Sequence, residues 1–181
     1  MTIGIYPADV LQRAAGIRLI GFDVDGTLTD GRLIYGTDGH EAKSFHVQDG
    51  LGLVLLRHAG ITTALVTARN STVVEQRGSE LQIPHVHVGE RAKLACMQKI
   101  AAGMGIGMQA VAFVGDDLPD LATLRGVGLA IAPANAHAWI LAEAHWVTPR
   151  DGGAGAARDA CDLLLHAQGK VEAILAHGEH P

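Results

Sequence analysis

Short apolar runs alternate along the chain with longer amphipathic segments. Five of these runs end at polar or glycine positions, and most are rich in β-branched residues, which is typical of strands buried inside a sheet. The predicted strands are Leu19–Val24, Thr62–Val66, His85–Val88, Val111–Gly115 and Val127–Ile131.

Helical patterns separate most of these strands. The predicted helices are Asp49–Ala59, Thr72–Leu81, Arg91–Ala102, Leu118–Arg125 and Ala156–Gln168. Four of them stop directly before a glycine, the residue that most often ends a helix, at Gly60, Gly103, Gly126 and Gly169. The pattern Thr72-x-x-Glu75 predicts a capping box. Strands that alternate with helices indicate an α/β fold with a doubly wound, Rossmann-like parallel sheet, whose ligands bind at the C-terminal strand ends.

One segment interrupts the alternation, between the first strand and the first helix. It is predicted to form a β-hairpin with arms Arg32–Tyr35 and His40–Phe45 around Gly36-Thr37-Asp38-Gly39. No insertion is long enough for a separate cap domain, and no repeat or interdomain linker is evident. Residues 1–181 are therefore expected to form a single domain.

Composition narrows the class of protein. Apolar residues make up 48% of the chain and aromatic residues only 4%, so the core must be built mainly from aliphatic side chains. The net charge of −5 argues against a nucleic-acid surface. Cys96 and Cys161 lie in apolar helical patterns and are expected to be reduced core thiols. Neither a signal peptide nor a run long enough to span a membrane is evident, so a cytoplasmic location is expected.

Most residues that could take part in a reaction follow the predicted strands. Asp23 and Asp25 end the first strand, Thr67 ends the second, and the acids of Gly115–Asp120 end the fourth. Lys93 stands near the start of a helix. Each feature alone also fits a solvated loop, a cap or a surface lysine. Together they supply carboxylates, a hydroxyl, an ammonium group and oxygen ligands for a hard divalent cation, which are the needs of phosphoryl transfer.

The order DxDGT, Thr, Lys, GDDxxD resembles the haloacid dehalogenase superfamily of phosphatases. The likeness runs from Leu19 to Lys170 and includes DVDGTLTDG, the segment Lys43-Ser44-Phe45, GDDLPD and GGAGAARDACDLLLHAQGK. The resemblance implies an uncapped fold of the haloacid dehalogenase type. It also implies that Asp23 is the nucleophile that becomes phosphorylated and that Asp25 is the general acid and then the general base.

The resemblance further implies a magnesium site. Mg²⁺ would be bound by the Asp23 carboxylate, the Asp25 backbone carbonyl and Asp116, with Asp117 and Asp120 behind them, supporting metal-bound waters or Lys93. Thr67 and Lys93 would hold the phosphoryl oxygens.

The implied substrate is a phosphorylated sugar acid. The closer resemblance is to enzymes of lipopolysaccharide sugar synthesis that act on 3-deoxy-D-manno-octulosonate 8-phosphate, and the alternative is N-acylneuraminate 9-phosphate. Arg69 and Arg77 are candidates to bind the sugar carboxylate, because a guanidinium can bind a carboxylate through two parallel bonds. The family pattern is broken at Ala68, His46, Gln48 and Ala154, where glycine, asparagine and two arginines are usual. These changes leave the particular sugar acid open.

The resemblance also implies assembly. We expect a homotetramer formed around the apolar hairpin, with the glycine-rich segment 150–155 reaching a neighbour's site, where Gly152 and Gly153 would approach the substrate. A plain flexible connector is the other interpretation of that segment.

His85 and His87 share a strand face but have no third ligand at clear spacing, so a structural role is expected.

Two other classes of protein share parts of this pattern. A signalling receiver domain uses similar residues, but its acidic pair and its phosphorylated aspartate follow a different chain order. A catalytically silent subunit conflicts with the intact acids.

Overall fold

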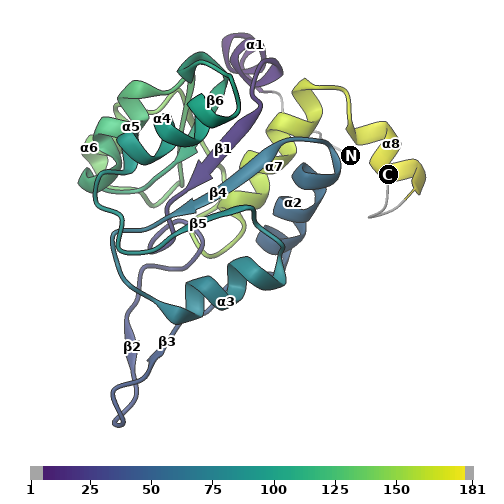
Figure 1. Cartoon of the computed structure of the whole chain (residues 1–181). Helices are drawn as coiled ribbons and strands as arrows, with labels where there is room; N and C mark the ends of the chain where they lie inside the picture. The colour runs from purple at the N-terminus through teal and green to yellow at the C-terminus, as the bar shows by residue number, and fades with distance from the viewer. Residues whose placement is uncertain (1–5, 178–181) are drawn as a thin grey trace.

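A six-stranded parallel sheet forms the centre of the computed structural model, which describes residues 6–177 (Figure 1). The strand order is β5-β4-β1-β6-β7-β8, and every neighbouring pair is parallel. The strands are β1 (Leu19–Phe22), β4 (Thr62–Val66), β5 (His85–His87), β6 (Val111–Val114), β7 (Leu129–Ala132) and β8 (Trp146–Val147). The chain order reverses at β1, which lies between β4 and β6, so the C-terminal end of β1 is the place where a ligand site is expected.

Helices cover both faces of the sheet, as the alternating pattern predicted. One face carries α1 (Ala8–Ala15), α2 (Val47–His58), α3 (Thr72–Glu80) and α7 (Ala156–Ala167). The other carries α4 (Lys93–Gly103), α5 (Leu121–Gly126) and α6 (Ala138–Leu141). Ile20 of β1 enters the first core and Leu19 the second, because successive side chains of a strand point to opposite faces. None of the helices between residues 6 and 177 is long and apolar enough to cross a membrane.

The doubly wound architecture is confirmed, while several short elements were not predicted. These are α1, α6, α8 (Val171–His177), β8 and the 3₁₀ turn Met108–Ala110. The last predicted strand begins two residues late, at Leu129. The predicted capping box of α3 is wrong. Ser71 is the N-cap residue and its side chain does not cap the helix, because its hydroxyl donates to Glu41 Oε2 at 2.8 Å.

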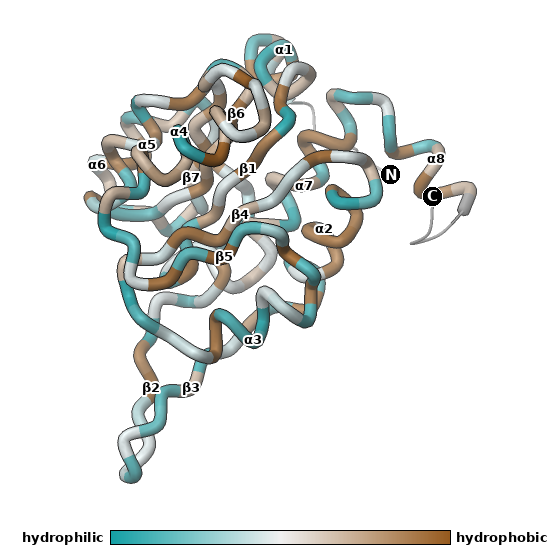
Figure 2. The backbone as a smooth tube through the Cα atoms, viewed as in Figure 1, coloured by the Kyte–Doolittle hydropathy of each residue, from teal (hydrophilic) through white to brown (hydrophobic). Residues whose placement is uncertain are grey.

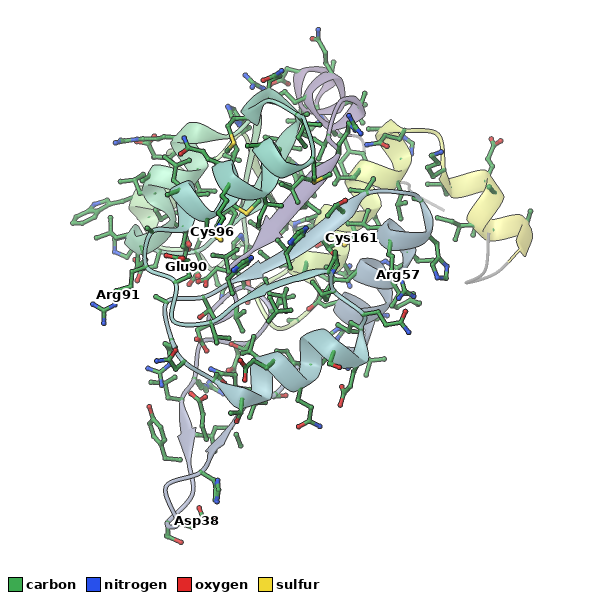
Figure 3. All side chains as sticks on the ribbon, in the orientation of Figure 1. Asp38, Arg57, Glu90, Arg91, Cys96 and Cys161 are labelled. Atoms are coloured by element: carbon green, nitrogen blue, oxygen red, sulfur yellow. The ribbon has the colours of Figure 1, made fainter. Side chains whose placement is uncertain are left out.

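The predicted hairpin is present and consists of β2 (Ile34–Tyr35) and β3 (Glu41–Ala42). It projects from the body of the molecule, with Asp38 at its tip (Figures 1 and 3). Figure 2 shows apolar colour at β2 and hydrophilic colour toward the tip. Leu33, Ile34 and Tyr35 are exposed, whereas Phe45 packs against the core. Between β1 and α2 the described chain holds only this hairpin, so no cap domain covers the sheet edge.

Candidate active site

Acidic residues gather at the C-terminal ends of β1 and β6. Asp23 directly follows β1, and its N–H donates to the carbonyl of Val114 on β6 at 2.9 Å. Asp116 follows β6, and the buried Thr67 follows β4 on the other side of β1. The sheet therefore brings together one residue from each of three neighbouring strand ends.

Lys93 lies between two of the acids. Its Nζ is 2.8 Å from Asp23 Oδ1 and 2.6 Å from Asp120 Oδ1, and its side chain is almost fully buried. The other oxygen of Asp120 accepts from the N–H groups of Asp116 at 3.1 Å and Asp117 at 3.4 Å. Asp120 therefore supports both the lysine and the backbone that presents Asp116. Asp117 is exposed and caps the 3₁₀ turn Leu118–Asp120 by accepting from the Leu118 N–H at 2.8 Å.

The acids outweigh the single ammonium group that faces them. Burial, followed by the charge of Asp120, raises the pKa of Asp23 to about 8. Burial and the neighbouring charges of Asp120 and Asp117 raise the pKa of Asp116 to about 6. Burial alone would lower the pKa of Lys93, but the charges of Asp23 and Asp120 outweigh it and leave that pKa raised. Without a cation, these buried acids therefore hold protons more tightly than free carboxylates do.

These carboxylates fit a divalent cation. One oxygen each of Asp23, Asp116 and Asp120 lies within 4.8 Å of the others. Oxygen ligands of this kind suit Mg²⁺, and a cation would offset the charge that raises the pKa of Asp23. The Asp25 carboxylate is not in this group. The peptide after Asp25 does border it, because a Cβ on Gly26 would come within 2.0 Å of Asp116 Oδ2.

A second group of charged side chains lies around Asp25. Lys43, from the end of the hairpin, forms an ion pair with Asp25 Oδ1 and lies 3.3 Å from Glu41 Oε1. The Nε of Arg69 is 3.8 Å from Asp25 Oδ2, and its Nη2 donates to Tyr35 Oη at 2.8 Å and to Glu41 at 3.1 Å. Sequence reasoning placed Arg69 near the substrate but assigned no role to Lys43 or Glu41. The basic residue in Lys43-Ser44-Phe45 was the only available signal.

Arg77 is not brought to this group. Its guanidinium lies 5.8 Å from the centre of the Phe45 ring and pairs with Glu80 at 3.3 Å, one turn along α3. The face of α3 that carries Arg77 points toward the start of α2, where its Nη2 is close to Gly50. The prediction that Arg77 binds the sugar carboxylate is therefore not supported within one chain.

The glycine-rich segment packs on its own chain, and the expectation that it also reaches a neighbour's site stays a prediction. The Gly153 N–H donates to the Thr27 carbonyl at 3.0 Å, and the Gly152 N–H donates to Asn135 Oδ1 at 2.9 Å. A Cβ on Gly152 would come within 1.8 Å of the Gly26 carbonyl oxygen. These glycines allow close backbone contact with the loop after Asp23, and their predicted role in substrate binding stays a prediction.

The remaining candidates have structural surroundings. The rings of His85 and His87 stack with centroids 6.3 Å apart, and no third metal ligand accompanies them among residues 6–177. Cys96 and Cys161 are both buried and free, and they lie on different helices of the body (Figure 3). Burial raises the pKa of the Cys161 thiol well above its usual value, so the thiol stays protonated.

Comparisons with known proteins agree with this site. A family model described as haloacid dehalogenase-like hydrolase matches residues 89–158. The chain is 43% identical to a 3-deoxy-D-manno-octulosonate 8-phosphate phosphatase of Yersinia pestis, over 91% of this chain and 88% of the relative. The chain therefore belongs to the haloacid dehalogenase-like hydrolases and, among them, to the family of these phosphatases.

Solved structures give the same assignment. A hypothetical protein of Xanthomonas campestris is 50% identical, with a TM-score of 0.94 over 97% of this chain and 96% of that one. A 3-deoxy-D-manno-octulosonate 8-phosphate phosphatase of Moraxella catarrhalis, in complex with magnesium, phosphate and KDO, is 40% identical, with a TM-score of 0.92 over 95% of this chain and 99% of that one. The protein is accordingly a phosphatase of the haloacid dehalogenase type.

Proposed function

We propose that this protein is a magnesium-dependent phosphatase of 3-deoxy-D-manno-octulosonate 8-phosphate, acting through a phosphorylated aspartate. The observation that carries the proposal is the position of Asp23 at the end of β1, paired with Lys93 and facing Asp116. A carboxylate at this place has an ammonium group and a cation site beside it, and phosphoryl transfer depends mainly on such positioning and charge neutralisation.

The reaction proceeds in two steps. In the first, an Asp23 oxygen attacks phosphorus, the bond to the sugar oxygen breaks, and Asp25 donates a proton to that oxygen. In the second, water attacks phosphorus, its proton goes to Asp25, and the bond to Asp23 breaks to release phosphate. Lys93 faces the phosphoryl oxygens from the Asp23 side, and the hydroxyl of Thr67 donates to one of them.

Magnesium is the cofactor of this proposal. Asp23, Asp116 and the backbone carbonyl of Asp25 would hold the ion, which neutralises charge on the transferring phosphoryl group. Asp120 stays with Lys93, because its oxygens already accept from the ammonium group and from two backbone N–H groups.

The substrate assignment rests on the relatives and on Arg69. The family relatives are named for this eight-carbon sugar acid phosphate, a precursor in lipopolysaccharide synthesis. Arg69 is two-fifths exposed and stands beside Asp25, where the leaving sugar would lie. Its Nε is buried and has no hydrogen-bond partner among the described residues, so a donor beside Asp25 is left unsatisfied.

The proposal includes assembly and location. The exposed apolar side chains of Leu33, Ile34 and Tyr35 suit an interface between copies, and we propose a homotetramer built around the hairpin. Light scattering that reports a monomer would contradict this part alone.

Residues 1–181 form one catalytic domain in this proposal. The free cysteines Cys96 and Cys161 fit a reducing compartment, which supports a proposed cytoplasmic location.

Steady-state kinetics on a panel of phosphates tests the substrate. We expect the highest kcat/KM for 3-deoxy-D-manno-octulosonate 8-phosphate and a much lower value for a neutral hexose phosphate. A higher value for N-acylneuraminate 9-phosphate would transfer the assignment to that sugar acid. Absence of any phosphate release, from p-nitrophenyl phosphate included, would indicate a catalytically silent protein.

A further inference from the structure

Lys43 is an unusual residue for a hairpin arm. Its backbone directly follows β3, on an element that projects from the body, yet only 1% of its side chain is exposed. Burying an ammonium group is costly unless carboxylates compensate it. Lys43 has two such partners, Asp25 and Glu41. The side chain therefore turns back from the hairpin to the loop after β1.

The contact distinguishes the two oxygens of Asp25. Lys43 donates to Oδ1, whereas Oδ2 is buried and has no hydrogen-bond partner. The Arg69 Nε lies 3.8 Å from Oδ2 and is likewise buried without a hydrogen-bond partner. One oxygen is thus held by the protein, and the other has no hydrogen bond of its own. This is the arrangement that a carboxyl group needs to exchange a proton with a substrate oxygen at one defined place.

Glu41 keeps Lys43 in position. One of its oxygens faces both Lys43 at 3.3 Å and Arg69 at 3.1 Å, and the other accepts from the Ser71 hydroxyl at 2.8 Å. Arg69 and Ser71 belong to the loop between β4 and α3, which begins at Thr67. Through these two contacts Glu41 connects the hairpin to that loop. The two acids and two bases balance in charge, and the contacts span three segments that are distant in sequence.

We propose that Lys43 is a positioning residue that fixes the Asp25 carboxyl group for proton transfer, so that the base of the hairpin belongs to the catalytic machinery. This inference rests on the proposed function, in which Asp25 serves the leaving oxygen and then the attacking water. With Oδ1 held, Oδ2 gives its proton to the sugar oxygen as the P–O bond breaks. In the second step the same oxygen takes a proton from water.

A phosphate-binding role is the other chemistry open to a lysine near this site. Geometry argues against it for Lys43. Lys93 already pairs with Asp23 at the phosphoryl side, whereas the ammonium of Lys43 is enclosed by Asp25 and Glu41. A lysine that binds phosphate would affect every phosphate ester. A lysine that positions Asp25 affects the phosphorylation step only for substrates whose leaving oxygen needs a proton, although it affects hydrolysis of the acyl phosphate for every substrate.

That difference defines the test. Lys43→Met keeps the length of the side chain and removes the charge, and Lys99→Met on the exposed face of α4 is the matched control. Both are assayed with magnesium in a single turnover, which measures the phosphorylation step alone, on the sugar acid phosphate, a poor leaving group, and on p-nitrophenyl phosphate, whose leaving group departs without a proton. For Lys43→Met we expect release of the sugar acid in this step to slow by about 100-fold, the scale of a lost general acid, with release of p-nitrophenol within about threefold. Lys43→Arg, which keeps the charge, should recover part of the loss.

Release of p-nitrophenol in the first step also shows that the variant is folded with an intact phosphoryl site. Equal losses in the first step on both substrates, or no loss on the sugar acid phosphate, would overturn the proposal. Asp25→Asn separates this outcome from a failure of the proposed function. If the first step of Asp25→Asn is slowed selectively on the sugar acid phosphate and that of Lys43→Met is not, only the role of Lys43 is wrong. If the first step of Asp25→Asn shows no selective loss, the assignment of Asp25 as general acid is wrong.

Discussion

The ammonium group of Lys93 lies 2.8 Å from the carboxylate of Asp23, and both side chains are almost withdrawn from water. Lys93 also lies 2.6 Å from Asp120, so one ammonium group pairs with two buried carboxylates. The arrangement leaves one acid more than Lys93 can pair, and a bound cation or a proton on Asp23 compensates for it. Catalysis, metal binding and stability are therefore linked through this pair.

Lys93→Met should destabilise the protein as well as inactivate it. Breaking a buried ion pair from one side costs about 3 kcal/mol or more, because the acids keep their burial and lose their partner. Urea unfolding in EDTA at neutral pH measures the loss, with Lys99→Met as the exposed control. Adding Asp120→Asn to Lys93→Met should restore part of the stability, since it removes one unpaired charge. A Lys93→Met variant as stable as the parent would contradict the linkage.

Removal of metal should abolish turnover. After exhaustive EDTA treatment we expect no activity, full recovery with Mg²⁺ and inhibition by Ca²⁺, which takes more ligands at longer distances. Mg²⁺ should also raise the melting temperature of the parent, because it binds only the folded site. Asp116→Asn should lose that rise, whereas Asp30→Asn at an exposed position of the same edge should keep it. Activity that persists in EDTA would refute the metal requirement.

Gly152→Ala tests the support of the catalytic loop. Its Cβ would meet the Gly26 carbonyl oxygen at 1.8 Å, and backbone cannot move aside as a side chain can. We expect a loss of about 2 kcal/mol or more in the free energy of unfolding, together with reduced kcat. Gly103→Ala is the matched control, because nothing lies within 4 Å of its added Cβ. That substitution should be neutral or stabilising by about 0.5–1 kcal/mol. Equal effects of the two substitutions would show that the contact is unimportant.

Asp49 should make stability depend on pH. Burial raises the pKa of this α2 carboxyl group above 3.8, although Oδ1 accepts from the Arg158 N–H at 2.7 Å. A raised folded pKa means that the folded state holds the proton more tightly. The stabilisation that this proton gives the folded state is therefore complete below pH 3.8, and it is lost as pH rises through the pKa of Asp49 in the folded protein. Relative to the parent, Asp49→Asn should gain stability with rising pH across that window in urea unfolding. The exposed Asp9→Asn should show no such trend, and a parallel profile for Asp49→Asn would contradict the interpretation.

Much of the site could be predicted because its signals are local. Asp23, Thr67 and Asp116 each follow a buried strand, and parallel strands bring such ends to one edge. Lys43 could not be predicted in its role, because its contact with Asp25 depends on how the hairpin folds back over 18 residues. The sequence likewise does not say which face of α3 carries Arg77, which packs on Phe45.

The missed elements are short or weakly patterned. Strand β8 has two residues at the sheet edge, and α6 has four. Neither is long enough for apolar periodicity to distinguish it from a loop. The predicted reach of segment 150–155 to a neighbour came from resemblance alone. Within its own chain the segment contacts Thr27, which is more than a hundred residues away in sequence, and Asn135, which is 17 residues away.

Detection of a phosphoryl group on Asp23 tests the central claim most directly. In the Asp25→Asn variant, p-nitrophenyl phosphate can still phosphorylate the enzyme, because its leaving group needs no proton, while hydrolysis of the acyl phosphate is slowed by loss of the general base. Acid quench during turnover with Mg²⁺, followed by peptide mass analysis, should find one phosphoryl group on the peptide that contains Asp23. Asp23→Asn should show none and should lose at least about 10³-fold in kcat, the least expected on removal of a covalent nucleophile. A phosphoryl group on another residue, or an Asp23→Asn variant within tenfold of the parent, would contradict the account.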